Sequence, residues 1–295
     1  MRNTTNRTSE QVRIGLVQWE VKLFASFESF CDKIDAQLQV MAYQKVDLVV
    51  FPEYFSLVLL NLFADKDEQL QLEGLAGLSN FLIAHFSDCA QKYSLNIVAG
   101  SWLRKEGDQL FNTSFFIHRS GEVESFNKIH LTPFEKSEWN LSGGDTLGVF
   151  FADIGTIGVQ ICYDVEFPEL GRLYAEVGVD ILCVPFSTDT QEGYFRVRNC
   201  AQARAIENEC YVAMAGCVGF LAELSAVEFQ YGKSAVFTPV DLMFPSAGIQ
   251  QELDANVEGI VLADVNLTAL KKLHQSGSVQ NLKDRRPDFY GKFWS

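Results

Sequence analysis

Three side chains with catalytic chemistry each follow a segment that is predicted to form a β-strand. Glu53, Lys128 and Cys162 all lie within two residues of the end of such a segment. Strand ends in one sheet can converge on a single cleft, and α/β proteins usually bind their ligands there. Cys162 also precedes a helical pattern, and the amino end of a helix stabilises a thiolate.

A glutamate, a lysine and a cysteine together suit nucleophilic attack on a carbon that is bonded to nitrogen. A free thiol has a pKa of about 8.5, so it needs a base or a cation nearby to become a thiolate, and Glu53 can take its proton. The ammonium of Lys128 and the backbone N–H of Tyr163 would hold the oxyanion that forms on an amide carbon. Glu53 would then protonate the departing amine and activate water against the thioester.

The elements that must position these residues follow from the hydrophobic pattern. Apolar residues spaced by three and four predict helices over 27–41 and 75–89, and further helices are predicted near 166–177 and 194–208. Strands are predicted at 12–19, 46–51, 96–101, 112–118, 122–126, 148–152, 156–161, 180–185, 211–216, 234–238 and 257–265. The βαβαβ opening indicates parallel strands with crossover helices. Strands that are apolar on both faces require cover on both sides, from helices and from a second sheet.

Composition limits the classes of function. The formal charge of −14 and the absence of a dense Lys/Arg cluster argue against nucleic-acid and anionic-membrane partners. No apolar run approaches the roughly 20 residues that span a bilayer, and residues 1–9 are polar, so we expect a cytoplasmic protein with a flexible amino terminus and one domain over 10–291. The seven cysteines show no spacing that suits zinc, and neither a metal nor a cofactor is expected.

The motifs around the three residues resemble those of a known family. Glu53 ends Phe-Pro-Glu, Lys128 lies in Asn-Lys-Ile-His-Leu, and Cys162 begins Cys-Tyr-Asp-x-x-Phe-Pro-Glu. These segments resemble the carbon–nitrogen hydrolase, or nitrilase, superfamily, whose members use a Glu-Lys-Cys triad. Residues 202–208 and 285–290 resemble two further motifs of that family, so the similarity spans about residues 12–291.

The resemblance implies a fold, an assembly and a fourth site residue. The fold would be an α/β, four-layer αββα sandwich with mixed sheets and helices on the outer faces. Protomers of the family pair through a helical face, which implies a homodimer or a larger homo-oligomer. The family keeps a second glutamate seven residues after the lysine, and Glu135 occupies that position here.

The segment 187–198 lacks a tryptophan that other members carry in this region. It resembles a branch that is often fused to an acetyltransferase domain, for which this chain is too short. The departure leaves the triad intact, but it means that substrates of better-studied amidases do not transfer directly.

The remaining residues near the motifs fall into two groups. Candidates for lining the pocket follow strand ends and are Tyr54, Tyr163, Phe186 and Thr188. Residues interpreted as structural are His130, Asp164, Glu169, Arg204 and Glu207. Arg204 and Glu207 are three apart on a predicted helix, which suits a local ion pair.

We therefore predict a hydrolase of non-peptide C–N bonds that acts through a Cys162 thioester. A small linear amide or an N-carbamoyl compound is preferred as substrate over a nitrile. The alternatives are nitrile hydrolysis, acyl transfer to an amine by the same triad, a non-catalytic scaffold or binding protein, and a redox-sensing thiol protein.

Overall fold

The computed structural model describes residues 10–63 and 67–293, and the flexible segment expected at 1–9 lies outside them. The strands are β1 (Gln11–Glu20), β2 (Leu48–Val50), β3 (Asn96–Glu106), β4 (Gln109–Ile117), β5 (Val123–Asn127), β6 (Gly148–Ala152), β7 (Gly155–Val159), β8 (Ile181–Phe186), β9 (Tyr211–Phe220), β10 (Phe229–Gln230), β11 (Ala235–Phe237), β12 (Ile249–Glu252) and β13 (Gly259–Asn266). The helices are α1 (Phe27–Tyr43), α2 (Glu68–Gly77), α3 (Ser79–Tyr93), α4 (Pro133–Ser137), α5 (Pro168–Val177), α6 (Gln191–Glu207), α7 (Leu267–Ser276) and α8 (Pro287–Tyr290). The 3₁₀ helices in the described part of the chain are η1 (Phe55–Leu62), η2 (Cys162–Glu166) and η3 (Ser225–Val227).

Two mixed sheets meet along β1. The first has the order β5-β4-β3-β2-β1, with β13 antiparallel to β1, and the second has the order β9-β8-β7-β6, with β11 and β12 beyond β9. Strand β1 pairs with β13 up to Gln18 and then runs parallel to β9 at Trp19 and Glu20. This short pairing joins the two sheets into one folded-over surface.

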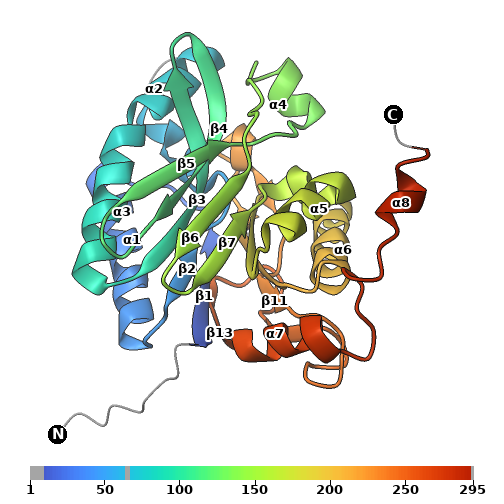
Figure 1. Cartoon of the computed structure of the whole chain (residues 1–295). Helices are drawn as coiled ribbons and strands as arrows, with labels where there is room; N and C mark the ends of the chain where they lie inside the picture. The colour runs from blue at the N-terminus through green and yellow to red at the C-terminus, as the bar shows by residue number, and fades with distance from the viewer. Residues whose placement is uncertain (1–9, 64–66, 294–295) are drawn as a thin grey trace, which may run out of the picture.

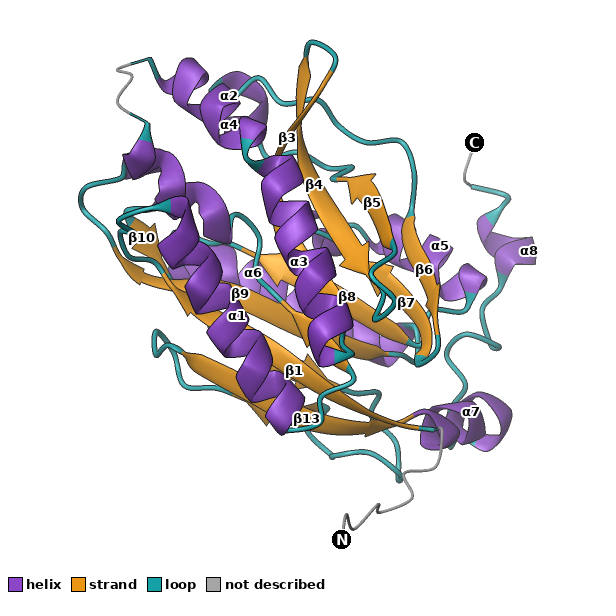
Figure 2. Ribbon diagram, turned by 90° about the vertical axis from the view of Figure 1, so that its left-hand side faces the viewer, coloured by secondary structure: helices purple, strands orange, loops and turns teal. Residues whose placement is uncertain are grey.

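Helices cover the outer face of each sheet, with α1 and α3 on one side and α5 and α6 on the other (Figure 1). Side chains alternate along β1: Ile14 and Leu16 belong to the cluster that contains β8, whereas Val17 and Trp19 pack with the buried side of α1. Figure 2 shows α1 and α3 lying across the first sheet. The expected αββα sandwich is confirmed.

Most predicted elements form, but two segments differ. The helix predicted over 75–89 is two helices, α2 and α3, which meet at Leu78 after Gly77 ends the first, and glycine is a poor helix former. No element was predicted between 52 and 74, but the structure has the 3₁₀ helix η1 there, whose first six residues are buried, and the start of α2; residues 64–66 lie outside the described chain. The elements β10, β12, α4, α7 and α8 were not predicted. None of the described helices is long and apolar enough to cross a bilayer.

Candidate active site

Cys162 occupies a strained turn between a strand and a helix. Ile161 is extended, and Cys162 has a φ of 49°, a left-handed conformation that L side chains rarely adopt. Such conformations cost energy and cluster at functional sites. The sulfur lies 3.8 Å from the backbone oxygen of Ser187. The turn therefore places the thiol beside the end of β8.

Lys128 joins two buried carboxylates. Its Nζ lies 2.8 Å from Oε1 of Glu53 and 2.9 Å from each carboxylate oxygen of Glu135. The three residues are at most 3% exposed. Together with Cys162 they line one cavity of about 520 Å³, so the structure brings these four predicted site residues to the same place.

Glu135 is fixed from both ends of its carboxylate. The hydroxyl of Tyr54 donates to Oε1 at 2.7 Å, and the backbone N–H of Thr132 donates to Oε2 at 2.8 Å. Thr132 caps the first turn of α4, and its hydroxyl accepts from the backbone N–H of Glu135, which forms a reciprocal capping box. A local helix start thus orients the second carboxylate.

Two groups that the sequence motifs did not indicate hold Glu53 in place. The side-chain nitrogen of Asn112 donates to Glu53 Oε1 at 2.9 Å and to Glu135 Oε1 at 3.1 Å. The backbone N–H of Ser187 donates to Glu53 Oε2 at 3.0 Å. The register of the β4–β5 hairpin could have indicated Asn112, because the antiparallel pairing of Thr113 with Asn127 places Asn112 opposite Lys128.

Burial and charge set the protonation of the site. Burial raises the pKa of Glu53 above its ordinary value; Lys128 opposes this shift, and the Glu135 carboxylate adds to it. Burial alone would lower the pKa of Lys128, but Glu135 and Glu53 raise it overall. Burial would likewise raise the pKa of Glu135, yet Lys128 and the Tyr54 hydroxyl lower it.

The thiol is protonated in the resting site. Burial and the neighbouring Glu53 carboxylate raise the pKa of Cys162 well above its ordinary value, and Lys128 only partly offsets them. The thiolate expected from the amino end of a helix is therefore not formed in advance. Its proton must leave during attack, and a Glu53 carboxyl with a raised pKa is suited to accept it.

A buried carboxylate ties the cysteine turn to the lysine segment. Oδ1 of Asp164 accepts from the backbone N–H of His130 at 2.7 Å and lies 3.0 Å from its Nδ1. Oδ2 of the same side chain accepts from the backbone N–H of Ile161 at 3.2 Å. On the far side of the turn, Arg204 Nε donates to the backbone oxygen of Val165 at 3.0 Å.

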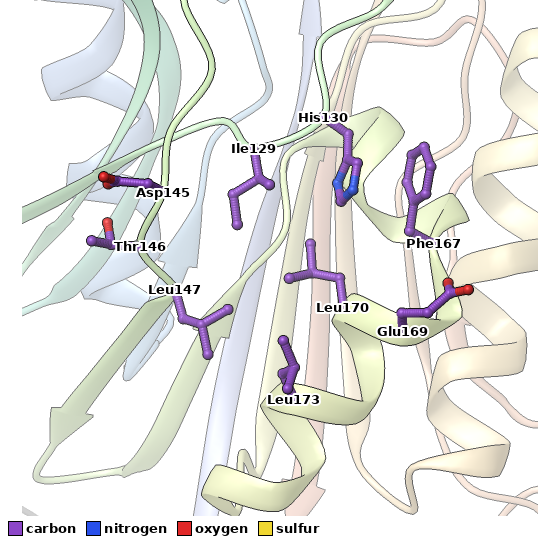
Figure 3. A pocket seen from close by; sticks show the side chains of 9 residues that line it. All are labelled: Ile129, His130, Asp145, Thr146, Leu147, Phe167, Glu169, Leu170 and Leu173. Carbon is purple, nitrogen blue, oxygen red and sulfur yellow. The ribbon is translucent and has the colours of Figure 1, made fainter. Parts of the chain in front are cut away.

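A second hollow, of about 530 Å³, lies between α5 and the segments after β5 and before β6 (Figure 3). Figure 3 shows Leu170 and Leu173 of α5 facing it, with Leu147 opposite. The His130 ring stacks on Phe167 with a centroid separation of 3.7 Å. The lining of this hollow includes none of the four catalytic candidates.

The other predicted pocket residues differ in their placement. Tyr54 lines the catalytic cavity, but the lining found for it does not include Tyr163, Phe186 or Thr188. The Tyr163 ring packs edge-on against Phe167, and Phe186 is fully buried in the core. The Thr188 hydroxyl donates to the backbone oxygen of Tyr231 at 2.7 Å. The further lining residues are Leu57, Thr132, Phe134, Trp139, Ser187, Asp189, Thr190, Ser225, Ala226, Glu228, Phe229 and Gln230. In the part of the chain that the structure describes, no group of three or more His, Cys, Asp or Glu side chains is arranged to hold a metal ion.

Known proteins resemble this chain over most of its length. The sequence pattern of the carbon-nitrogen hydrolase family matches residues 13–275. The chain is 39% identical over 279 residues to the probable hydrolase YhcX of Bacillus subtilis. This match covers 95% of this chain but only 54% of YhcX, so the chain spans about half the length of that relative. It is 28% identical over 245 residues to a deaminated glutathione amidase of Synechocystis, covering 79% of this chain and 84% of that protein.

The fold of this chain is also similar to that of solved structures. The crystal structure of a carbon-nitrogen hydrolase from Helicobacter pylori superposes with a TM-score of 0.79 at 20% identity, covering 97% of this chain and 99% of that one. The family pattern spans the segments that carry Glu53, Lys128 and Cys162. The chain therefore belongs to the carbon–nitrogen hydrolase family.

Proposed function

We propose that this chain hydrolyses a non-peptide C–N bond of a small linear amide or N-carbamoyl compound, using Glu53, Lys128 and Cys162. One observation carries the proposal: the Lys128 ammonium bridges two buried carboxylates in the cavity that also holds the Cys162 thiol. The amidase named among the relatives supports the amide class.

In the first half of the reaction, Glu53 takes the thiol proton as the Cys162 sulfur attacks the amide carbon. The carbonyl oxygen becomes anionic and is held by the Lys128 ammonium and the backbone N–H of Tyr163. In the resting site Lys128 donates once to Glu53 and to both carboxylate oxygens of Glu135, so the oxyanion takes over one of the two donors that point at Glu135. When the intermediate collapses, the C–N bond breaks, Glu53 returns its proton to the departing nitrogen, and a thioester remains.

In the second half, Glu53 takes a proton from water as the water oxygen attacks the thioester carbon. The C–S bond breaks, the sulfur receives the proton from Glu53, and a carboxylic acid leaves. Glu135 acts by orientation, because it holds the Lys128 ammonium in place while its own carboxylate is held by Tyr54 and Thr132. No cofactor takes part in these steps.

The experiment is a screen for released ammonia or amine over amides, carbamoyl amines and nitriles. Wild-type protein should form an acyl adduct on Cys162, seen by intact mass, and Cys162→Ala should neither form it nor turn over. Cys200→Ala is the matched control, because Cys200 lies on α6 away from the cavity lining and should keep full activity. Undiminished hydrolysis by Cys162→Ala would refute the mechanism.

We also infer that residues 10–291 form one hydrolase domain in a cytoplasmic protein that pairs with a second copy through α5 and α6. The apolar side chains of Leu173, Val177, Phe195 and Ile206 on these helices are exposed. Large exposed apolar surface of this kind is typical of interfaces. Light scattering of the intact chain measures the assembly, and a monomer at micromolar concentration would contradict it.

A further inference from the structure

Two exposed carboxylates, those of Asp189 and Glu228, line the catalytic cavity. Asp189 lies three residues after β8, Glu228 immediately precedes β10, and both exposed side chains line the cavity. The backbone N–H of Tyr231 donates to the oxygen of Thr188 at 2.8 Å, which holds these two segments side by side. Within residues 10–63 and 67–293, neither carboxylate forms a hydrogen bond or an ion pair. Both charges are therefore available to a ligand.

The same wall offers no free positive charge. Lys128 is the one cationic side chain among the described residues that line the cavity, and Glu53 and Glu135 already surround it. A substrate carboxylate placed near Asp189 and Glu228 would be repelled without compensation. A positive group in that position would be attracted by both.

Aromatic rings form much of the remaining surface. Trp139 packs edge-on against Tyr54, with centroids 5.3 Å apart, and against Phe134, with centroids 5.2 Å apart, and all three line the cavity together with Phe229. The faces of such rings attract cations within about 6 Å. Aromatic surface beside carboxylates suits an organic cation with an apolar chain.

A buried amide also faces this space. Gln230 is 6% exposed and lines the cavity, and its Oε1 accepts from the Ser187 hydroxyl at 2.7 Å. Its side-chain nitrogen has no hydrogen-bond partner among the described residues. This nitrogen does not belong to the fully buried atoms that lack a partner, so it is open to the cavity and can donate to a substrate oxygen.

We propose that the substrate is a cationic amide or carbamoyl compound, with an ammonium or guanidinium group joined by a short apolar chain to the bond that Cys162 attacks. This inference rests on the proposed function, since it assigns the substrate class of the same site. The positive group lies between Asp189 and Glu228, and the chain runs along the Trp139 wall.

The first experiment compares three amides of similar length: 5-aminopentanamide, hexanamide and glutaramate, which are cationic, neutral and anionic. We expect kcat/KM to be about tenfold higher for the cationic than for the neutral amide, because each solvent-exposed charge pair contributes up to about fivefold. The anionic amide should be the poorest. The preference should shrink at 1 M salt, where the Debye length falls to about 3 Å. Equal values for the three amides, or a preference for glutaramate, would overturn the proposal.

Isosteric variants test which charges are responsible. Asp189→Asn combined with Glu228→Gln should reduce the ratio of kcat/KM for the cationic and neutral amides to about one. Glu223→Gln is the matched control, because Glu223 is an exposed carboxylate a few residues before Glu228 that does not line the cavity. It should leave the ratio unchanged, and a loss of the ratio in this control would overturn the assignment to Asp189 and Glu228.

A binding assay separates this inference from the proposed function. Pentylammonium, pentanol and pentanoate are compared as protectants of Cys162 against alkylation by iodoacetamide, followed by peptide mass. Pentylammonium should protect at the lowest concentration, and this protection should weaken in the double variant. If neither these amides nor any compound of the wider screen is hydrolysed, the proposed function fails, but selective protection by pentylammonium still supports a cation site. Protection by pentanoate that equals or exceeds that by pentylammonium overturns it.

Discussion

Asp164→Asn is expected to slow catalysis although the side chain does not line the catalytic cavity. Its carboxylate accepts from the backbone N–H groups of His130 and Ile161 with different oxygens, and it is fully buried. His130 lies two residues after Lys128, and Ile161 immediately precedes Cys162. Asp164 is thus a positioning residue that sets the ammonium and the thiol relative to each other.

The magnitude follows from the hydrogen bonds that the substitution disturbs. Asparagine keeps one acceptor oxygen, so one of the two backbone N–H groups faces an NH₂ group instead. A hydrogen bond to a charged acceptor contributes about 1.5–3 kcal/mol, and a buried donor left unpaired costs about 1–3 kcal/mol. We expect the free energy of unfolding to fall by roughly 2–4 kcal/mol. A displacement of catalytic groups by about 1 Å costs about 100-fold in rate, so kcat should fall by about that factor with a smaller change in KM.

The assay combines urea unfolding with single-turnover formation of the acyl adduct on Cys162. Asp153→Asn is the matched control, because Asp153 also accepts a side-chain hydrogen bond, from Asn96 at 2.8 Å, but lies at the surface with its side chain 56% exposed. Asp153→Asn should change neither the free energy of unfolding nor the rate of adduct formation. If Asp164→Asn lost stability but kept the wild-type rate of adduct formation, the positioning role would be refuted.

Two further predictions concern the charges of the site. Lys128→Met leaves Glu53 and Glu135 without their shared cation, so activity should fall at least about 10²-fold and stability by about 3–5 kcal/mol at pH 8. Without the cation the pKa of both carboxyls should lie above its ordinary value, so the loss of stability should shrink as pH falls from 8 to 5. Urea unfolding measures this loss, and equal losses at the two pH values would contradict the charge assignment. For the wild type, Glu53 must be ionised to take the thiol proton, and its pKa lies above the ordinary 4.5, so kcat/KM should fall with decreasing pH through a midpoint above 4.5. A pH profile of kcat/KM measures this, and a midpoint at or below 4.5 would show that the acid limb belongs to another group.

The stability of the wild type should show opposite effects of the two carboxyls. The pKa of Glu135 is lowered in the folded protein, so its contribution is present above the unfolded value of 4.5 and is lost as pH falls through the folded value. The pKa of Glu53 is raised, so its ionisation opposes folding as pH rises past 4.5. In Glu135 the effects of Lys128, the Tyr54 hydroxyl and the Thr132 N–H on the pKa thus outweigh that of burial, whereas in Glu53 the effect of burial prevails over that of Lys128.

The parts of this protein that the sequence determined by itself are those with a local physical cause. The apolar spacing of Phe30, Ile34 and Leu38 defines the buried side of α1, because side chains three and four apart share a helix face. The hairpin of β4 and β5 formed with the expected limits to within three residues at each end. The order of the Glu53, Lys128 and Cys162 motifs was sufficient to indicate the family.

Tertiary structure alone decided how those residues act. Asn112 and the Ser187 N–H reach Glu53 across 59 and 134 residues of sequence; the hairpin register indicates only that Asn112 lies beside Lys128, and no local pattern places either group against Glu53. Tertiary packing also buried the thiol beside the Glu53 carboxylate, which raised the pKa of the thiol, so that attack requires a base, the role that we propose for Glu53. Phe186 illustrates the same limit, since its place after the strand predicted at 180–185 suggested the pocket, whereas Phe186 is the last residue of β8 and its side chain is buried in the core. Residue types fix which chemistry is available, but burial and long-range contacts fix which protonation states and which neighbours each side chain has.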